Sequence, residues 1–176
     1  MIEINEASNK FSEIKIMTFL ELGDSRGVFT KFYEKNIQKS FDFKIDEVFL
    51  STSKKDVIRG MHLQSKSHSL EKIVICLEGS ITDVVVDLRD KSTTYGDYIE
   101  YELDQESPAG IFVPEGFGHG FKVNSENAKV LYLQSGDYNK DSEIGINPLS
   151  LGYNWNIEFP YISERDLALP ELKDFR

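Results

Sequence analysis

Cysteine, tryptophan and histidine are scarce in this chain of 176 residues, which has one Cys, one Trp and three His. The single cysteine, Cys76, excludes an internal disulfide, so we expect a reducing, cytoplasmic compartment. The amino terminus has no long apolar run and no cleavage pattern, so we expect neither a signal peptide nor a membrane anchor. The chain also lacks glycine-rich phosphate loops and a G-x-S-x-G motif, which argues against those nucleotide-binding and hydrolase classes.

Positive charge is in the minority, because 30 Asp and Glu against 20 Lys and Arg give a formal net charge of -10. A surface this acidic repels phosphate polymers, so we expect no nucleic-acid partner. A small anionic ligand in a locally basic pocket is still compatible with this charge, since distant surface charges are screened at physiological salt.

Linkers, internal repeats and low-complexity tracts are absent too, and the length suits one domain with a core, spanning residues 1–176. Short runs rich in Val, Ile, Tyr and Phe alternate with turns in the middle of the chain, which is typical of strands. Eight strands are predicted, at residues 47–53, 57–64, 72–77, 81–88, 98–103, 109–114, 118–123 and 129–134.

So many closely spaced strands predict an all-β sandwich or barrel. We expect residues 77–80 to form a tight hairpin with Gly79 at positive φ. Helical patterns are weak and predict only short flanking helices, around residues 35–41 and 163–172.

The side-chain period of two places polar residues on one face of several predicted strands. Lys72, Asp83 and Tyr132 each lie on such a mixed face. If these faces point inward, the three side chains line a common cavity. The alternative, with the mixed faces toward solvent, is equally compatible with the pattern.

Few residues suit metal binding or nucleophilic catalysis. An H-x-H metal motif is broken by Gln64, which leaves only Glu71 and His119 as partners for His62, so we expect no metal. Cys76 lies in an apolar strand without a neighbouring base, which predicts an inert thiol. Acid–base chemistry remains, with a histidine–carboxylate base, a tyrosine acid and a lysine that stabilises an enolate.

The segment VIRGMHLQ, residues 57–64, carries Arg59, Gly60 and His62 within one predicted strand. Strict alternation places Arg59 and His62 on opposite faces. A bulge at Gly60 turns both side chains inward, and we expect one there.

Several motifs together resemble the dTDP-4-dehydrorhamnose 3,5-epimerase family. They include DSRGVFTKFY, VIRGMHLQ, VDLRDKSTTYG, PEGFGHGF and SERD, in the family's order from about residue 24 to residue 170. The resemblance implies a cupin-type jelly-roll β-barrel and a homodimer. It also implies cofactor-independent epimerisation, at C3, C5 or both, of a nucleotide-linked 4-keto-6-deoxy sugar.

The resemblance assigns roles residue by residue. His62 is similar to the family's base and Asp166 to the aspartate that completes its dyad. Lys72 is matched to the group that stabilises the enolate oxygen, and Asp83 to a supporting partner of that lysine. Tyr132 is matched to the acid on the opposite side. The resemblance assigns contacts with the substrate to Arg26, Phe29, Lys31, Glu47, Phe49, Ser51, Arg59, His119, Tyr138 and Arg165. A second reading of Asp166 is open, since Ser163-x-x-Asp166 is also a helix-capping pattern.

The chain departs from the family at positions that contact the nucleotide base or the sugar. Lys31 stands where a glutamate is frequent, and EVFLS, residues 47–51, replaces QDNHS. These changes leave the nucleotide and the sugar open. Alternatives on the same fold are a C3-only epimerase, a 3,4-ketoisomerase and a non-catalytic nucleotide-sugar-binding protein.

Overall fold

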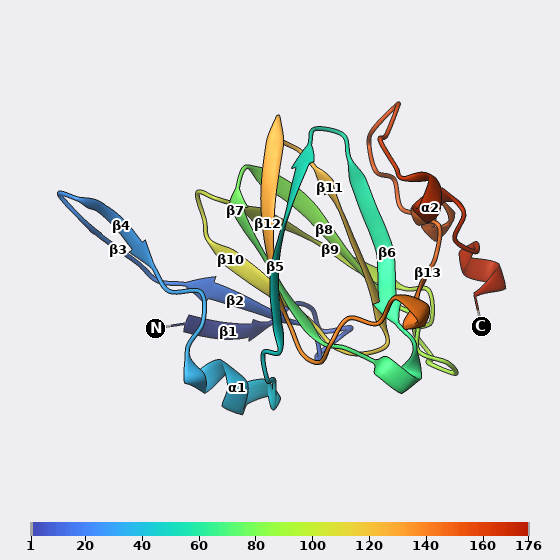
Figure 1. Ribbon diagram of the computed structural model, residues 1–176, viewed down its shortest axis with the longest axis horizontal. Helices are drawn as coiled ribbons and strands as arrows, with labels where there is room; N and C mark the ends of the chain where they lie inside the picture. The colour runs from blue at the N-terminus through green and yellow to red at the C-terminus, as the bar shows by residue number, and fades with distance from the viewer. Residues whose placement is uncertain (1, 176) are drawn as a thin grey trace.

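Two packed antiparallel sheets and a protruding hairpin make up most of the molecule, as the computed structural model shows (Figure 1). The structure describes residues 2–175, apart from the side chains of residues 36, 38 and 39. The six-stranded sheet has the order β1 (Ile2–Glu6), β2 (Lys15–Phe19), β10 (Ala109–Val113), β7 (Lys72–Glu78), β12 (Asn127–Gln134) and β5 (Glu47–Lys54). The five-stranded sheet has the order β13 (Glu143–Gly145), β6 (Ile58–Gln64), β11 (Phe117–Val123), β8 (Ser80–Asp87) and β9 (Tyr98–Asp104).

Helices are short and lie at the flanks, as predicted. The two α-helices are α1 (Lys35–Phe41) and α2 (Glu164–Leu167). The 3-10 helices are η1 (Lys66–His68), η2 (Lys140–Ser142), η3 (Pro148–Leu151) and η4 (Leu172–Asp174). None of the helices within residues 2–175 is long and apolar enough to cross a membrane.

The chain passes repeatedly from one sheet to the other. The links β5–β6, β7–β8, β10–β11 and β11–β12 each join strands of different sheets, which is the connectivity of a jelly roll. The predicted all-β jelly-roll barrel is therefore confirmed, and each of the eight predicted runs contains a strand. Strands β1, β2 and β13, and the strands at residues 21–24 and 27–30, were not predicted.

The predicted hairpin at residues 77–80 is wrong. β7 and β8 belong to different sheets, so Gly79 turns the chain between layers instead of pairing the two strands. Gly79 has φ +76°, and a Cβ there would lie 2.1 Å from the carbonyl oxygen of Asn127. The turn itself was predicted correctly, but local sequence cannot show which sheet the next strand joins.

The two faces of β7 are buried by different partners. Val74 and Cys76 pack between the sheets in a cluster with Phe121 and Val130. Ile73 and Ile75 point away from the other sheet and pack in a second cluster, which contains Ile37 of α1, Phe43 and Phe112. The mixed face of β7 therefore points inward, which decides between the two orientations that the sequence left open. Burial of each such side chain stabilises the fold by roughly 1.5–3 kcal/mol.

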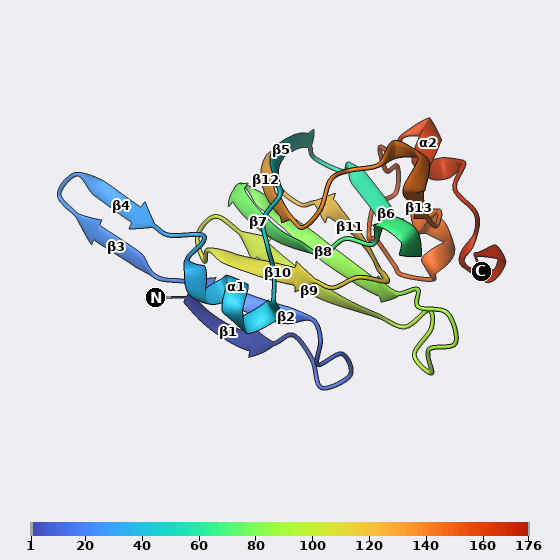
Figure 2. The same ribbon diagram turned by 60° about the horizontal axis from the view of Figure 1, so that its bottom comes forward.

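A two-stranded hairpin, β3 (Glu21–Asp24) with β4 (Gly27–Thr30), stands away from both sheets (Figures 1 and 2). Its large apolar side chains are exposed, with exposed fractions of 59% for Leu22, 65% for Val28 and 60% for Phe29. The hairpin has no core of its own, because a two-stranded ribbon buries too little apolar surface.

Candidate active site

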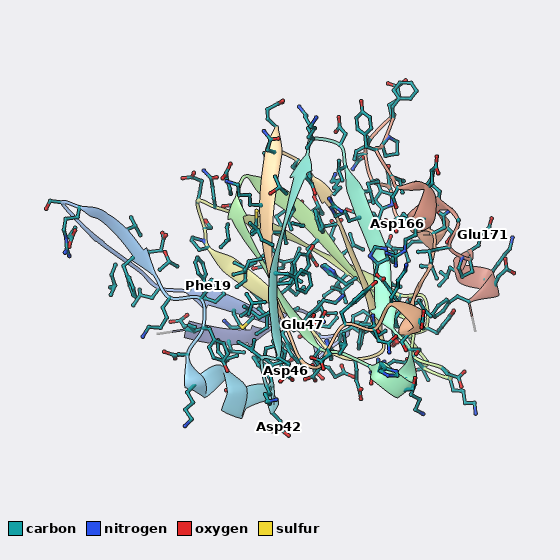
Figure 3. The ribbon with its side chains drawn as sticks, viewed as in Figure 1. Phe19, Asp42, Asp46, Glu47, Asp166 and Glu171 are labelled. Atoms are coloured by element: carbon teal, nitrogen blue, oxygen red, sulfur yellow. The ribbon has the colours of Figure 1, made fainter. Side chains whose placement is uncertain are left out.

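A cavity of about 500 Å³ lies between the two sheets. It is lined from β5, β6, β7, β11, β12 and β13 and from the segments that lead to β7 and β13. Figure 3 shows Glu47 on the β5 side and Asp166 on the β6 side of this region. Nine of the predicted site residues line the cavity: Glu47, Phe49, Ser51, Arg59, His62, Lys72, His119, Tyr132 and Tyr138.

A bulge in β6 brings Arg59 and His62 to the same cavity. His62 pairs with His119 and Arg59 pairs with Phe121, so two residues of β6 face one of β11 between them. Gly60 has φ +120°, and a Cβ there would lie 2.5 Å from Cα of Gly120. The predicted bulge is present, and glycine is required by both the backbone angle and the close approach of β11.

His62 and Asp166 form a hydrogen-bonded pair, with 2.7 Å between Nε2 and Oδ1. Because an ionised carboxylate only accepts hydrogen bonds, Nε2 carries the proton and Nδ1 keeps the lone pair. Burial alone would raise the pKa of Asp166, but hydrogen bonds from His62 and from the amide of Gly60 lower it overall. Asp166 is therefore ionised near neutral pH and fixes the histidine tautomer.

The helix cap predicted around Asp166 is present as well, and it positions the residue for its contact with His62. Ser163 Oγ accepts the amide hydrogen of Asp166 at 3.0 Å and caps α2. The segment before α2 is attached to the start of β6, because Tyr161 accepts the amide hydrogen of Ile58 and donates its own amide hydrogen to the carbonyl of Asp56. The cap uses the backbone of Asp166, so its carboxylate is free to reach His62.

A second histidine–aspartate pair lies across the β-ladder. His119 Nε2 and Asp83 Oδ2 are 2.7 Å apart, and both side chains are buried. Burial lowers the pKa of His119, outweighing the charge of Asp83, so the ring is neutral at physiological pH. Asp83 forms its hydrogen bond with His119, whereas it acts on Lys72 through its negative charge, which raises the pKa of the lysine. Its other oxygen, Oδ1, is buried without a hydrogen-bond partner among the described residues.

Lys72 extends into the cavity from the start of β7. Removal from water lowers its pKa to about 8, against the opposing effect of the negative charges of Asp83 and Glu143. The ammonium group is thus charged near neutral pH and only partly compensated. A cation in this state is suited to stabilising a negative charge that develops on a bound ligand.

Tyr132 lies on β12 and is 8% exposed. Burial raises the pKa of its phenol, opposed by the hydroxyl of Ser51, so the phenol is protonated and can donate a proton. Phe49 stacks on the Tyr132 ring, with 4.7 Å between centroids and 13° between planes. The Tyr132 ring also lies in a T-shaped arrangement with the ring of His119, with 6.3 Å between centroids and 81° between planes.

Charged groups surround the mouth of the cavity. Arg59 donates from Nε to Ser53 Oγ at 2.8 Å. Glu143 accepts a hydrogen bond from the Tyr138 hydroxyl and forms a salt bridge with Arg165. Arg165 was predicted to contact the substrate, but it does not line the cavity and contacts the lining only through its salt bridge with Glu143. Glu143 itself was not predicted.

The three predicted substrate contacts of the β3–β4 region lie outside the cavity of their own chain. Arg26 forms its salt bridge with Asp24 at the hairpin tip. Phe29 is on exposed β4, and Lys31 follows it. None of the three lines the cavity.

Seven lining residues were not predicted: Leu63, Gln64, Leu70, Phe117, Phe121, Gln134 and Glu143. Gln64 and Gln134 share faces with His62 and Tyr132 at a spacing of two, so alternation could have identified them. Glu143 follows a loop and a 3-10 helix, and no periodic signal marks it. Among the described side chains, no group of three or more His, Cys, Asp or Glu residues is arranged to hold a metal ion.

Comparison with known proteins identifies the family of the chain. The model of the family described as dTDP-4-dehydrorhamnose 3,5-epimerase matches residues 8–174. The chain belongs to this family. The resemblance predicted from the sequence is thereby confirmed.

Two curated members of the epimerase family illustrate its range. A dTDP-4-dehydrorhamnose 3,5-epimerase from Salmonella typhimurium is 37% identical over 158 residues, 85% of each chain. A dTDP-4-dehydrorhamnose 3-epimerase from Streptomyces niveus is 36% identical over 161 residues, 86% of this chain and 77% of that protein. Relatives at similar distance thus differ in the number of centres that their names specify.

A solved member of the epimerase family has the same architecture. It is a dTDP-6-deoxy-D-glucose-3,5-epimerase from Legionella pneumophila in complex with dTDP-4-keto-L-rhamnose. The two structures superpose with a TM-score of 0.92 at 30% identity, covering 100% of this chain and 95% of the other.

Proposed function

We propose that this chain, acting as one domain over residues 1–176, epimerises a nucleotide-linked 4-keto-6-deoxy sugar without a metal or organic cofactor. The observation that carries the proposal is the placement of a histidine–aspartate base and a buried tyrosine on opposite walls of one cavity, with a lysine beside them. Inversion at carbon needs these two groups, because the proton leaves one face and returns on the other.

In the proposed first step, Nδ1 of His62 takes the proton from the carbon next to the 4-keto group. The electron pair of the broken C–H bond moves to the ketone oxygen and forms an enolate. Asp166 stabilises the imidazolium, and the ammonium of Lys72 stabilises the enolate oxygen.

In the second step the enolate carbon takes the phenolic proton of Tyr132 from the opposite face. The electron pair returns from oxygen to carbon, and the centre is inverted. His62 then loses its proton to solvent and the tyrosinate gains one, so no net proton is consumed. Neither oxidant nor reductant is needed, because the ketone of the substrate acidifies its own neighbouring C–H bonds.

Substrate binding completes the proposal. Arg59 holds the pyrophosphate by charge-assisted hydrogen bonds, since its guanidinium is exposed at the mouth. The neutral ring of His119 contacts the sugar with the nitrogen that Asp83 leaves free. Phe49, Ser51 and Tyr138 line the path between the sugar and the nucleotide.

We further infer a homodimer in which the β3–β4 hairpin of one copy packs on the other. Leu22, Val28 and Phe29 then become buried, and Arg26, which lies outside the cavity of its own chain, meets the pyrophosphate bound to the partner. A single buried free thiol, Cys76, supports a reducing cytoplasmic location for this enzyme.

The test is proton NMR of nucleotide-linked 4-keto-6-deoxy hexoses in D2O, with the wild type and His62→Ala. The proposal predicts deuterium at C3, C5 or both, and loss of this exchange in the variant. Exchange at C3 alone identifies the C3-specific alternative, the activity that the name of the Streptomyces niveus relative specifies. Tight binding without exchange at either carbon would refute epimerisation and leave a binding protein.

A further inference from the structure

Glu47 is a carboxylate in the cavity lining to which no cation is paired among the described side chains. Its Oε1 accepts the amide hydrogen of Tyr138 at 3.2 Å, and its Oε2 accepts a hydrogen bond from Gln134 Nε2 at 3.2 Å. The other carboxylate of the lining, Glu143, is instead neutralised by Arg165. An ionised carboxylate can accept about four hydrogen bonds, so roughly two sites of Glu47 are free for a ligand.

The charge of Glu47 restricts what it can bind. A carboxylate repels the pyrophosphate and any ligand oxygen that carries only lone pairs. It attracts groups with N–H or O–H donors. The partner of Glu47 is therefore a hydrogen-bond donor of the substrate and cannot be its phosphates.

The surroundings of Glu47 point to the nucleobase and away from the sugar. Two of the groups proposed around the reacting carbons are enclosed, with exposed fractions of 4% for His119 and 8% for Tyr132. The aromatic rings next to Glu47 are open, with exposed fractions of 43% for Phe49 and 48% for Tyr138.

Tyr138 is fixed by two hydrogen bonds: its backbone amide donates to Glu47, and its hydroxyl donates to Glu143. A fixed and exposed aromatic ring is a stacking surface for a planar base. Glu47 bonds to the backbone amide of the same residue, so its carboxylate lies beside the residue that offers this surface.

We propose that Glu47 selects a nucleotide whose base carries an exocyclic amino group, cytosine or guanine, and discriminates against thymine. Cytosine presents an amino donor at C4, and guanine presents N1–H together with an amino group at C2. Thymine presents one N–H between two carbonyl oxygens, which the carboxylate repels. The inference rests on the proposed function for the presence of a nucleotide-linked substrate.

The experiment is calorimetric titration of the wild-type protein with CDP, GDP and dTDP. CDP or GDP is expected to bind at least about tenfold more tightly than dTDP, the discrimination that one good base contact supplies. The CDP and GDP arms distinguish cytosine from guanine. Binding of dTDP that is as tight as that of CDP and GDP would overturn the inference.

The variant Glu47→Gln tests the residue itself. A neutral amide can donate to a thymine carbonyl as well as accept from an amino group, so the preference is expected to shrink to less than about threefold, mainly through tighter dTDP binding. Glu78→Gln is the matched control, because Glu78 loses the same charge but pairs with Lys129 away from the cavity. An unchanged preference in Glu47→Gln would show that Glu47 does not read the base.

Deuterium exchange separates this inference from the proposed function. If a cytidine- or guanosine-linked sugar exchanges faster than the thymidine-linked sugar, both stand. If the thymidine-linked sugar exchanges fastest, base selection by Glu47 fails and epimerisation stands. If CDP or GDP binds best and no sugar exchanges, the base selection stands and epimerisation fails.

Discussion

At the scale of single residues, the site depends on two histidines that are both fixed by carboxylates and differ in environment. His62 is partly exposed to the cavity and its partner Asp166 comes from a distant helix, whereas His119 and Asp83 are both buried on adjacent strands. In the proposed mechanism, His62 can therefore release a proton to solvent after each cycle. His119 is enclosed and neutral, which suits a fixed contact to the sugar better than proton transfer.

The change Asp166→Asn is expected to lower kcat by about 10²- to 10⁴-fold, the usual contribution of a positioned acid–base group. The amide can donate to Nε2, which stabilises the wrong tautomer and moves the hydrogen to Nδ1. Steady-state kinetics and circular dichroism measure the effect and confirm the fold. Glu164→Gln removes the same charge from the neighbouring exposed position of α2, and a similar loss in that control would refute the tautomer argument.

The lowered pKa of Lys72 predicts that activity falls at alkaline pH. Its pKa is lowered to about 8 by burial, so the ammonium that stabilises the enolate is lost as the pH rises through this value. The ratio kcat/KM, which reports the free enzyme, is expected to fall above about pH 8. The raised pKa of Tyr132 places its ionisation well above this range.

The variant Lys72→Arg is the matched test of that limit. Arginine keeps its charge at alkaline pH, so the variant is expected to lose the fall above about pH 8, although with a lower maximal rate because the fork geometry differs. A pH profile that is the same in the wild type and in Lys72→Arg would contradict the assignment of the limit to Lys72.

At the scale of elements, α2 links stability to catalysis. It has only four residues, so its position depends on the cap of Ser163 and on the backbone pairing of Tyr161 with Val57, directly before β6. The same short element carries Asp166 into contact with His62. Loss of the cap therefore affects both the local fold and the orientation of the base.

Ser163→Ala is expected to cost about 1 kcal/mol of unfolding free energy, the usual value for a helix N-cap. Activity is expected to fall as well, because Asp166 loses the bond that orders its backbone. Urea denaturation and kcat measure the two effects. Ser163→Asp, which restores a capping oxygen, is expected to recover both, and a variant that recovers stability alone would separate the cap from the function of Asp166.

The elements also show what the sequence could and could not predict. Alternation placed Lys72 and Tyr132 on the mixed faces of β7 and β12, because that signal is local, but it left open whether these faces point inward. The sheet to which β8 belongs depends on long-range pairing with β11, so residues 77–80 were taken as a hairpin. Glu143 was missed for the same reason, since only the fold brings β13 to the edge of β6.

At the scale of the whole molecule, the exposed β3–β4 hairpin is the feature that a single chain leaves unexplained. The resemblance assigned Arg26, Phe29 and Lys31 to the substrate, but the structure places all three outside their own cavity. No sequence pattern could show this, because the distance between hairpin and cavity follows from the complete fold. The proposed second copy would account for both the exposed apolar surface and the assigned contacts.

Light scattering after size exclusion is expected to give the mass of two chains for the wild type. The double change Leu22→Asp and Val28→Asp introduces charge into the proposed interface and is expected to give the mass of one chain. Leu149→Asp is the control, since Leu149 is comparably exposed but lies on η3, away from the hairpin. A wild-type protein with the mass of one chain would contradict the proposed dimer.

The most direct test of proton transfer on two faces is the variant Tyr132→Phe, followed by NMR in D2O for both exchange and inversion. The account predicts that His62 still removes and returns protons on its own face, so deuterium enters the substrate. Inversion is lost, because the opposite face has no acid. Inversion at the wild-type rate in this variant would contradict the role of Tyr132 and with it the two-sided mechanism.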